Sequence, residues 1–268
     1  MGLNNSMSKE KFLVSVIIPI YNREKDVLET LHNIYKNNYR PIQLILVDDG
    51  SKDKSLMVLE DFKSKYESVD FTILILQQAN QGAPTARNNG YQHALGNFIQ
   101  FLDSDDKIHE DKFTIQIDEM NRMKGDFGLC DFEMIYTDTG RRVYHSNKDK
   151  IKKVLRTTGS FGCGSPLLRK SLADKIEWTI GLKRNQDVDY FLKGVLMSRK
   201  IAYVEQALYY YIRHDGERIS ASYSKTAPVY TERIRSLLKI FKSAPRKFSL
   251  ILAIVFLSIS KLKYILKG

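Results

Sequence analysis

The chain has 268 residues, of which 43% are apolar and 27% are charged, which fits one large globular α/β domain or a domain with an appendage. Its two cysteines, Cys130 and Cys163, are far apart and lack the spacing of a disulfide framework or a zinc site, which indicates a reducing compartment. The net charge of +11 does not indicate nucleic-acid binding, because seven basic residues and no acidic ones lie between Lys239 and the C-terminus.

Polar residues 1–12 are expected to be disordered and not to form a secretory signal, and the next hundred residues alternate between apolar strands and amphipathic helices. The β-branched run over 14–20 is typical of a central parallel strand, and apolar residues at helical spacing predict a helix over 27–36. A second apolar run over 44–47 ends in an Asp-Asp-Gly-Ser turn, and a helix over 53–66 follows it.

The third and fourth strands continue this alternation. Residues 71–76 form the third apolar run, and a turn at 80–84 leads into a helix that begins near Pro84. The fourth run, 98–102, stops at three carboxylates, and a helix over 111–123 follows. This succession predicts a parallel sheet, in which the carboxyl ends of the strands meet at one edge and form the ligand site.

The second half predicts a mixed arrangement of strands and helices. Residues 127–136 and 142–145 are expected to form a hairpin. A loop over 178–184 leads into 185–190, after which the apolar residues of 191–196 predict an amphipathic helix. Two short strands are expected over 201–204 and 208–212. The small residues of 159–166 indicate either a close approach to a ligand or a plain loop.

The C-terminal tail carries an apolar stretch, 248–259, bounded by Arg246, Lys247 and Lys261. About a dozen residues is shorter than the ~20 that a membrane-spanning helix needs. The pattern therefore predicts a helix that lies in the interface of an anionic membrane. The alternatives are a helix buried in a homodimer or packed against the domain.

Four motifs, taken together and in order, resemble the family 2 inverting glycosyltransferases of the GT-A fold. They are VSVIIPIYN (14–22), VDDGS (47–51), NQGAPTARNNG (80–90) and FIQFLDSDD (98–106). The resemblance implies a GT-A-like, Rossmann-type nucleotide-binding sheet that continues into a mixed-sheet acceptor half and ends in a helical tail. We expect a donor-binding half over 13–125, an acceptor and catalytic-base half over 126–222, and a basic, apolar tail over 223–268.

The resemblance also implies a binding site for a nucleotide-sugar, with a UDP-sugar favoured. Tyr21 and Asn22 would follow the first strand and, with Asp49, hold the base and ribose, since a carboxylate accepts from uracil N–H or ribose hydroxyls. Arg87 would lie against the nucleotide or its phosphates, or else pair with one of the clustered aspartates. Asp103 would face the ribose or an ordered water.

Asp105 would bind Mn²⁺ or Mg²⁺ on the diphosphate, because such cations typically take one or two carboxylates together with phosphate oxygens. Asp106 is expected to cap the next turn. His214 would complete the metal shell or contact the diphosphate, or be a structural residue, since imidazole is an acceptable ligand for Mn²⁺.

An inverting transfer needs a base that removes the proton of the acceptor hydroxyl. The position that matches the base of the family is Asp187, although Gln186 precedes it where an acidic residue is commoner. Asp189 is the alternative, and a helix N-cap is the non-catalytic role that both could have.

The resemblance thus implies a metal-dependent transferase of bacterial surface-glycan synthesis with a saccharide or lipid-linked acceptor. The basic, apolar tail predicts a peripheral position on the cytoplasmic face of the membrane. A haloacid-dehalogenase-like phosphatase is an alternative, but its Asp-x-Asp belongs on the first strand, not on the fourth. A pyrophosphorylase would carry a Gly-rich phosphate loop, whereas residues 14–23 contain no glycine. A catalytically inert sugar-binding module is the remaining alternative.

Overall fold

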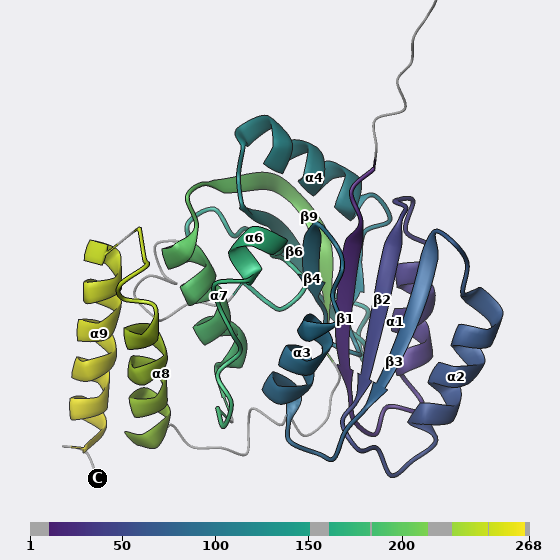
Figure 1. The fold of residues 1–268 in the computed structure, drawn as a ribbon, viewed down its shortest axis with the longest axis horizontal. Helices are drawn as coiled ribbons and strands as arrows, with labels where there is room; N and C mark the ends of the chain where they lie inside the picture. Colours follow the sequence, from purple (N-terminus) through teal and green to yellow (C-terminus); the bar gives the residue numbers. More distant parts are fainter. Residues whose placement is uncertain (1–10, 151–160, 183, 214–226, 246, 266–268) are drawn as a thin grey trace, which may run out of the picture.

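The computed structural model describes residues 11–150, 161–182, 184–213, 227–245 and 247–265. A twisted sheet runs through the molecule, and helices cover both of its faces (Figure 1). The strands lie in the order β3-β2-β1-β4-β8-β6-β9-β5, and β7 pairs with β6 outside this path. This arrangement confirms the predicted α/β class, in which a parallel half continues into a mixed half.

The parallel half follows the predicted alternation of strands and helices. β1 pairs in parallel with β2 and β4, and β2 pairs in parallel with β3. The elements are β1 (Val14–Ile20), α1 (Val27–Tyr35), β2 (Ile42–Asp48), α2 (Ser55–Tyr66), β3 (Phe71–Gln77), α3 (Ala83–Gln92) and β4 (Phe98–Phe101).

The mixed half is built around a long strand pair, β6 with β9, which is parallel. β8 is antiparallel to both β4 and β6 and so joins the two halves of the sheet. The elements are β5 (Lys107–Ile108), α4 (Lys112–Met123), β6 (Phe127–Tyr136), β7 (Arg142–His145), β8 (Leu167–Arg169), α6 (Lys170–Ala173), α7 (Gln186–Met197) and β9 (Ile201–Arg213).

The prediction of two short strands over 201–204 and 208–212 was wrong, because both belong to the single strand β9. Its partner β6 is continuous, so backbone pairing resumes after the polar residues Glu205 and Gln206. The register shifts between Cys130 and Phe132 absorb the extra residues, as a β-bulge does.

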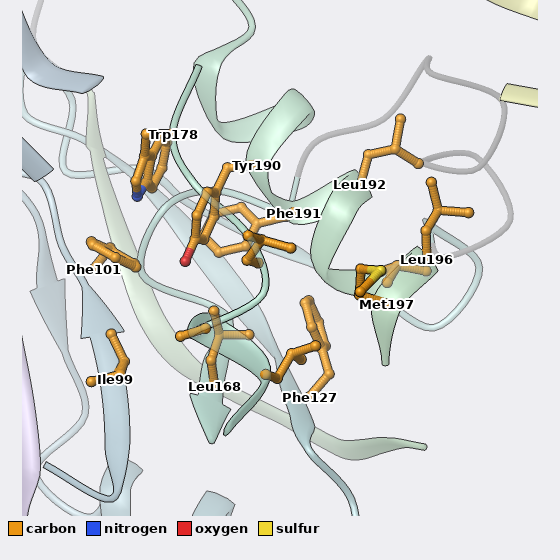
Figure 2. Close-up of a cluster of buried hydrophobic side chains, with 14 of the residues drawn as sticks. Ile99, Phe101, Phe127, Leu168, Trp178, Tyr190, Phe191, Leu192, Leu196 and Met197 are labelled. Carbon is orange, nitrogen blue, oxygen red and sulfur yellow. The ribbon is translucent and has the colours of Figure 1, made fainter. Parts of the chain in front are cut away.

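The sheet separates two hydrophobic clusters, because alternate side chains of a strand point to opposite faces. On one face, Ile17 and Phe101 pack with residues of α3, α6 and α7. On the other, Val16 and Ile18 pack with residues of α1, α2 and α4. Figure 2 shows part of the first cluster, where Trp178 and Tyr190 lie beside Phe101. The two rings are stacked, with centroids 4.2 Å apart.

The C-terminal tail forms two helices, α8 (Ala227–Lys239) and α9 (Lys247–Ile265), which pack together beside α7 (Figure 1). One face of the pair is buried in the first cluster through Leu237, Ile240, Ala244, Ala253 and Leu257. Within the described ranges, no helix has the length and apolar character needed to cross a membrane.

A buried lysine lies beneath β4, the strand that leads into the acidic motif. The ammonium of Lys112 is fully buried and donates to the side-chain oxygens of Gln100 (2.7 Å) and Gln116. Gln116 in turn donates to the backbone oxygen of Ser165 (3.1 Å). Burial lowers the pKa of Lys112 to about 8, because the amide oxygens carry no charge to offset the desolvation.

This lowered pKa predicts that the contribution of Lys112 to stability rises in alkaline solution. Between about pH 8 and the ordinary lysine pKa, Lys112 is protonated in the unfolded chain and largely neutral in the folded chain, so its contribution to the free energy of unfolding increases with pH in that window. Relative to Lys112→Met, the wild type should gain about 2 kcal/mol between pH 7.5 and 9.5, measured by urea unfolding. A difference that does not change with pH would show that the ammonium is not desolvated.

Candidate functional site

Three adjacent parallel strands bring the predicted polar turns to one edge of the sheet. β1 lies between β2 and β4, and Ile20 pairs with Asp48 at the ends of their strands. The turns after these strands are linked directly, because the Asn22 N–H donates to the Ser51 hydroxyl (3.0 Å) and the Arg23 guanidinium pairs with Asp105 (3.3 Å). The residues that follow β1, β2 and β4 therefore share one rim.

Tyr21 and Asn22 form the turn after β1. The side chain of Tyr21 is exposed at the rim. Asn22 adopts a left-handed backbone conformation (φ 52°), which Asn tolerates better than most residues, and its side-chain oxygen accepts from the Lys52 N–H (2.8 Å). Asn22 therefore fixes the turn after β1 to the turn after β2.

Asp49 is buried and organises the turn that begins α3. Its carboxylate accepts hydrogen bonds from the N–H groups of Gln81 (2.9 Å) and Gly82 (2.8 Å) and from the side-chain amide of Gln78 (2.7 Å). Gly82 has a φ of +88°, which is strained for other residues. Because a carboxylate offers about four acceptor positions, Asp49 can accept one further hydrogen bond from a ligand.

Arg87 of α3 connects the two halves of the molecule. The buried guanidinium donates to Asp103 after β4 (2.5 Å) and to the side chain of Gln186 at the start of α7 (3.4 Å). It also lies 4.4 Å from the ring centroid of Trp178, a cation–π contact. Burial acts to lower the pKa of Arg87, but Cys163, Asp103 and Asp187 outweigh it, so the pKa is raised and the group stays charged.

The three carboxylates of the acidic motif have different environments. Asp103 and Asp105 are partly exposed at the rim and pair with Arg87 and Arg23, respectively. Asp106 does not cap the next turn as expected. It is fully buried and accepts from the Tyr209 hydroxyl and the Ile212 N–H (3.0 Å), because β9 lies directly beside the motif. Burial, followed by the charges of the other two aspartates, raises the pKa of Asp106 well above its usual range.

The donor set at the rim is compatible with a divalent cation shared with phosphate oxygens. In the part of the chain that the structure describes, no three His, Cys, Asp or Glu residues are grouped to hold a metal by themselves. Mg²⁺ in phosphate sites usually takes only one or two carboxylates, and the partly exposed Asp105 offers a carboxylate at the rim. His214 lies outside the described residues.

The structure separates the two candidate bases on α7. Asp187 in the first turn is half-buried, and its charge is one of those that act to raise the pKa of Arg87. Asp189 is completely buried and accepts from the Thr179 hydroxyl (2.7 Å) while pairing with Lys193 (3.0 Å). Asp189 therefore holds the fold of this half, and only Asp187 has a surface that a second substrate can reach.

Replacing Asp189 by Asn should destabilise the protein by about 3 kcal/mol, because it leaves the buried cations Lys193 and Arg233 without their carboxylate. The same change at the half-buried Asp187 should cost less than about 1 kcal/mol. Urea unfolding at pH 7 measures both values. Equal losses would contradict the assignment of Asp189 to the core.

Several residues of the site were not predicted from the sequence. Trp178 lies in the loop before α7, and its ring contacts both the Arg87 guanidinium and the Tyr190 ring. As the one tryptophan of the chain, it could have been singled out. Cys163 is buried among the charged groups of the site. Arg233 lies in the tail, and its position beside Asp189 follows only from the fold.

The fold and the rim of carboxylates define an α/β protein with a ligand site at the carboxyl ends of parallel strands. The chain belongs to glycosyl transferase family 2, whose family model matches residues 15–177. This match gives no support to the phosphatase hypothesis.

Two curated relatives are named for the synthesis of a minor teichoic acid and for glucosyl transfer to poly(ribitol phosphate). The minor teichoic acid biosynthesis protein GgaB of Bacillus subtilis is 27% identical over 94% of this chain and 29% of its own length. The poly(ribitol-phosphate) beta-glucosyltransferase of Bacillus spizizenii is 30% identical over 78% of this chain and 34% of its own length. The chain thus spans about a third of the length of these two relatives.

Solved structures share the fold. TarS 1–349 of S. aureus, in complex with UDP-GlcNAc, has a TM-score of 0.75 at 23% identity and covers 92% of this chain and 72% of its own. The mannosyltransferase PcManGT of Pyrobaculum calidifontis, in complex with GDP-Man and Mn²⁺, has a TM-score of 0.62 at 15% identity and covers 97% of this chain and 77% of its own. Both likenesses extend over the described C-terminal half as well as the parallel half.

Proposed function

We propose that this chain is a metal-dependent inverting glycosyltransferase that moves a sugar from a nucleotide diphosphate, with UDP favoured, to a saccharide or lipid-linked acceptor. The observation that carries the proposal is the position of Arg87, which contacts both Asp103 of the donor half and Gln186 beside the candidate base. One side chain thus joins the two groups that such a transfer must bring together. The UDP-GlcNAc complex of TarS and the names of the relatives support the same activity.

In this proposal, residues 13–125 bind the donor. Tyr21 and Asn22 hold the base, Asp49 accepts from the base or ribose, and Asp103 faces the ribose while Arg87 keeps it in place. Asp105 holds the cation, with His214 as a further candidate ligand. A bound Mn²⁺ or Mg²⁺ would offset the charge of the departing diphosphate, and the Mn²⁺ in the PcManGT complex supports this use.

The base of the proposed reaction is Asp187, within residues 126–222. Its carboxylate takes the proton of the acceptor hydroxyl as that oxygen attacks the anomeric carbon on the face opposite the diphosphate, which inverts the configuration. Gln186 is neutral and accepts from Arg87, so it adds no negative charge beside the guanidinium, which already pairs with Asp103. Asp189 remains a structural residue.

The activity is tested by incubating the protein with UDP-sugars and Mn²⁺ and measuring free UDP. A transferase should release UDP slowly when water is the only acceptor and faster when a saccharide acceptor is added. An inert binding module would bind the UDP-sugar without releasing UDP. If no UDP-sugar stabilises the protein against heat in the presence of Mn²⁺, the proposed donor class is wrong.

We also propose that the tail, 223–268, attaches the enzyme to the cytoplasmic face of the membrane. α9 buries one face against the protein but exposes Ile251, Leu252 and Val255, and the basic residues Lys242 and Lys261 lie near its ends. Apolar side chains beside lysines suit an anionic surface.

Vesicles that contain phosphatidylglycerol should bind the wild-type protein. They should not bind the double variant Ile251→Ser, Val255→Ser. Dimer formation in solution, abolished by the same changes, would instead assign this face to a second copy.

A further inference from the structure

Trp178 packs where three elements of the molecule meet. It belongs to the loop between α6 and α7 and is 1% exposed. Its ring is stacked on Tyr190 of α7, with centroids 4.2 Å apart, and forms an edge contact with Phe101 of β4 at 5.2 Å (Figure 2). The Arg87 guanidinium of α3 lies over the same ring, 4.4 Å from its centroid. The indole is therefore held between α3, α7 and β4.

One side chain, Asn88 of α3, holds the backbone of this loop at Trp178. The side-chain amide nitrogen of Asn88 donates to the Trp178 carbonyl oxygen (2.9 Å), and its amide oxygen accepts from the Trp178 N–H (2.9 Å). Both backbone polar groups of Trp178 are thus satisfied by a residue 90 positions away in the sequence. Because Asn88 follows Arg87 on α3, these bonds fix the loop to the helix that carries the guanidinium.

The indole in turn supports the Arg87 guanidinium. Arg87 makes one short hydrogen bond, to Asp103 (2.5 Å), and one long hydrogen bond, to Gln186 (3.4 Å). Its Nε is buried, and among the residues that the structure describes it has no hydrogen-bond partner. Two bonds at the terminal nitrogens leave the guanidinium plane free to tilt, whereas an aromatic face beneath the group fixes the plane. A displaced indole would therefore change how Arg87 faces Asp103.

Resting on the proposed function, we propose that Asn88 is a positioning residue for donor binding, which acts through Trp178 and Arg87. Its two hydrogen bonds hold the loop against α3, and the loop holds the indole beneath the guanidinium. The guanidinium is thereby aimed at Asp103 and the nucleotide. Asn88 is not among the residues proposed to contact the donor.

The first test needs no nucleotide, because Trp178 is the single tryptophan of the chain and its fluorescence reports its own surroundings. In Asn88→Ala the loop loses both hydrogen bonds, so water should reach the indole and the emission maximum should move to longer wavelength. The matched control is Asn33→Ala, which removes the same pair of amide–backbone hydrogen bonds between α1 and Ile108 (3.0 and 2.8 Å). The control variant should emit as the wild type does.

The second test is a double-mutant cycle on the affinity for UDP with Mn²⁺, measured by calorimetry. Asn88→Ala should weaken UDP binding by about fivefold, because the guanidinium loses its support. In an Arg87→Met background the same change should have no further effect, since the group through which Asn88 acts is already absent. A residue that supports only the fold would lower the affinity by the same factor in both backgrounds or in neither.

An unmoved emission maximum in folded Asn88→Ala, or additive effects in the cycle, would overturn the proposal. Asn88→Asp replaces the alanine variant if that does not fold, because it keeps the acceptor for the Trp178 N–H and loses only the donor to the carbonyl oxygen. Failure of both variants to fold would also overturn the proposal, since Asn88 would then belong to the core alone. A wild type that binds no nucleotide would instead contradict the proposed function, and the emission maximum of Asn88→Ala would still move.

Discussion

Asp187→Asn is expected to slow sugar transfer by about 10²–10⁴-fold while leaving the affinity for UDP within about twofold of the wild type. The amide keeps the size of the side chain and its place in the first turn of α7, but it cannot take a proton from the acceptor. Asp187 is not among the residues proposed to hold the nucleotide, so donor binding should be retained. Single-turnover transfer and calorimetric UDP binding measure the two quantities.

The control for this prediction is Asp189→Asn, which changes the same functional group two residues along the helix. Because Asp189 is buried between Lys193 and Thr179, that variant should lose stability first and activity only in proportion to the unfolded fraction. An active Asp187→Asn variant together with a folded, inactive Asp189→Asn variant would reverse the assignment.

Arg87→Met should weaken UDP binding by at least about tenfold and also lower the free energy of unfolding by about 2 kcal/mol. The change removes the hydrogen bonds to Asp103 and Gln186 and the cation above Trp178. We expect a smaller loss of stability than for a fully buried ion pair, because the Asp103 side chain is 35% exposed and solvent screens its charge.

Two further variants sharpen this result. Arg87→Lys keeps the charge but not the forked donor geometry, so it should fall between the wild type and Arg87→Met. Arg122→Met removes an exposed arginine that pairs with Glu119 on α4, and should leave both stability and UDP binding as in the wild type. If Arg87→Met bound UDP as tightly as Arg122→Met does, Arg87 would be a structural residue only.

The parallel half could be predicted because its signals are local. Each buried strand is a mostly apolar run, and each run ends at a polar turn, so Asp48 and Asp103 could be assigned to strand ends before their neighbours were known. These two aspartates are then expected to lie close together, because the carboxyl ends of parallel strands meet at one edge of the sheet. The order of the four motifs indicated the glycosyltransferase family, and the family model that matches residues 15–177 confirms it.

The mixed half could not be predicted in the same detail, because its contacts join distant residues. Asp106 reaches Tyr209 and Ile212 across 103 and 106 positions, and nothing near it in the sequence indicates that it is buried. Asp187 and Asp189 are both acidic residues in the first turn of one helix, and only the packing of α8 and Thr179 distinguishes them. The same holds for Arg233, which lies 44 positions from Asp189.

We propose that the carboxylates at the rim hold a cation that also binds the diphosphate of the donor. The direct measurement is the affinity of the full chain for UDP, with and without Mn²⁺, in the wild type and in Asp105→Asn. Mn²⁺ should strengthen UDP binding by at least about tenfold, or about 1.4 kcal/mol, in the wild type, and Asp105→Asn should lose that gain. UDP binding that is indifferent to Mn²⁺ in the wild type would contradict the account.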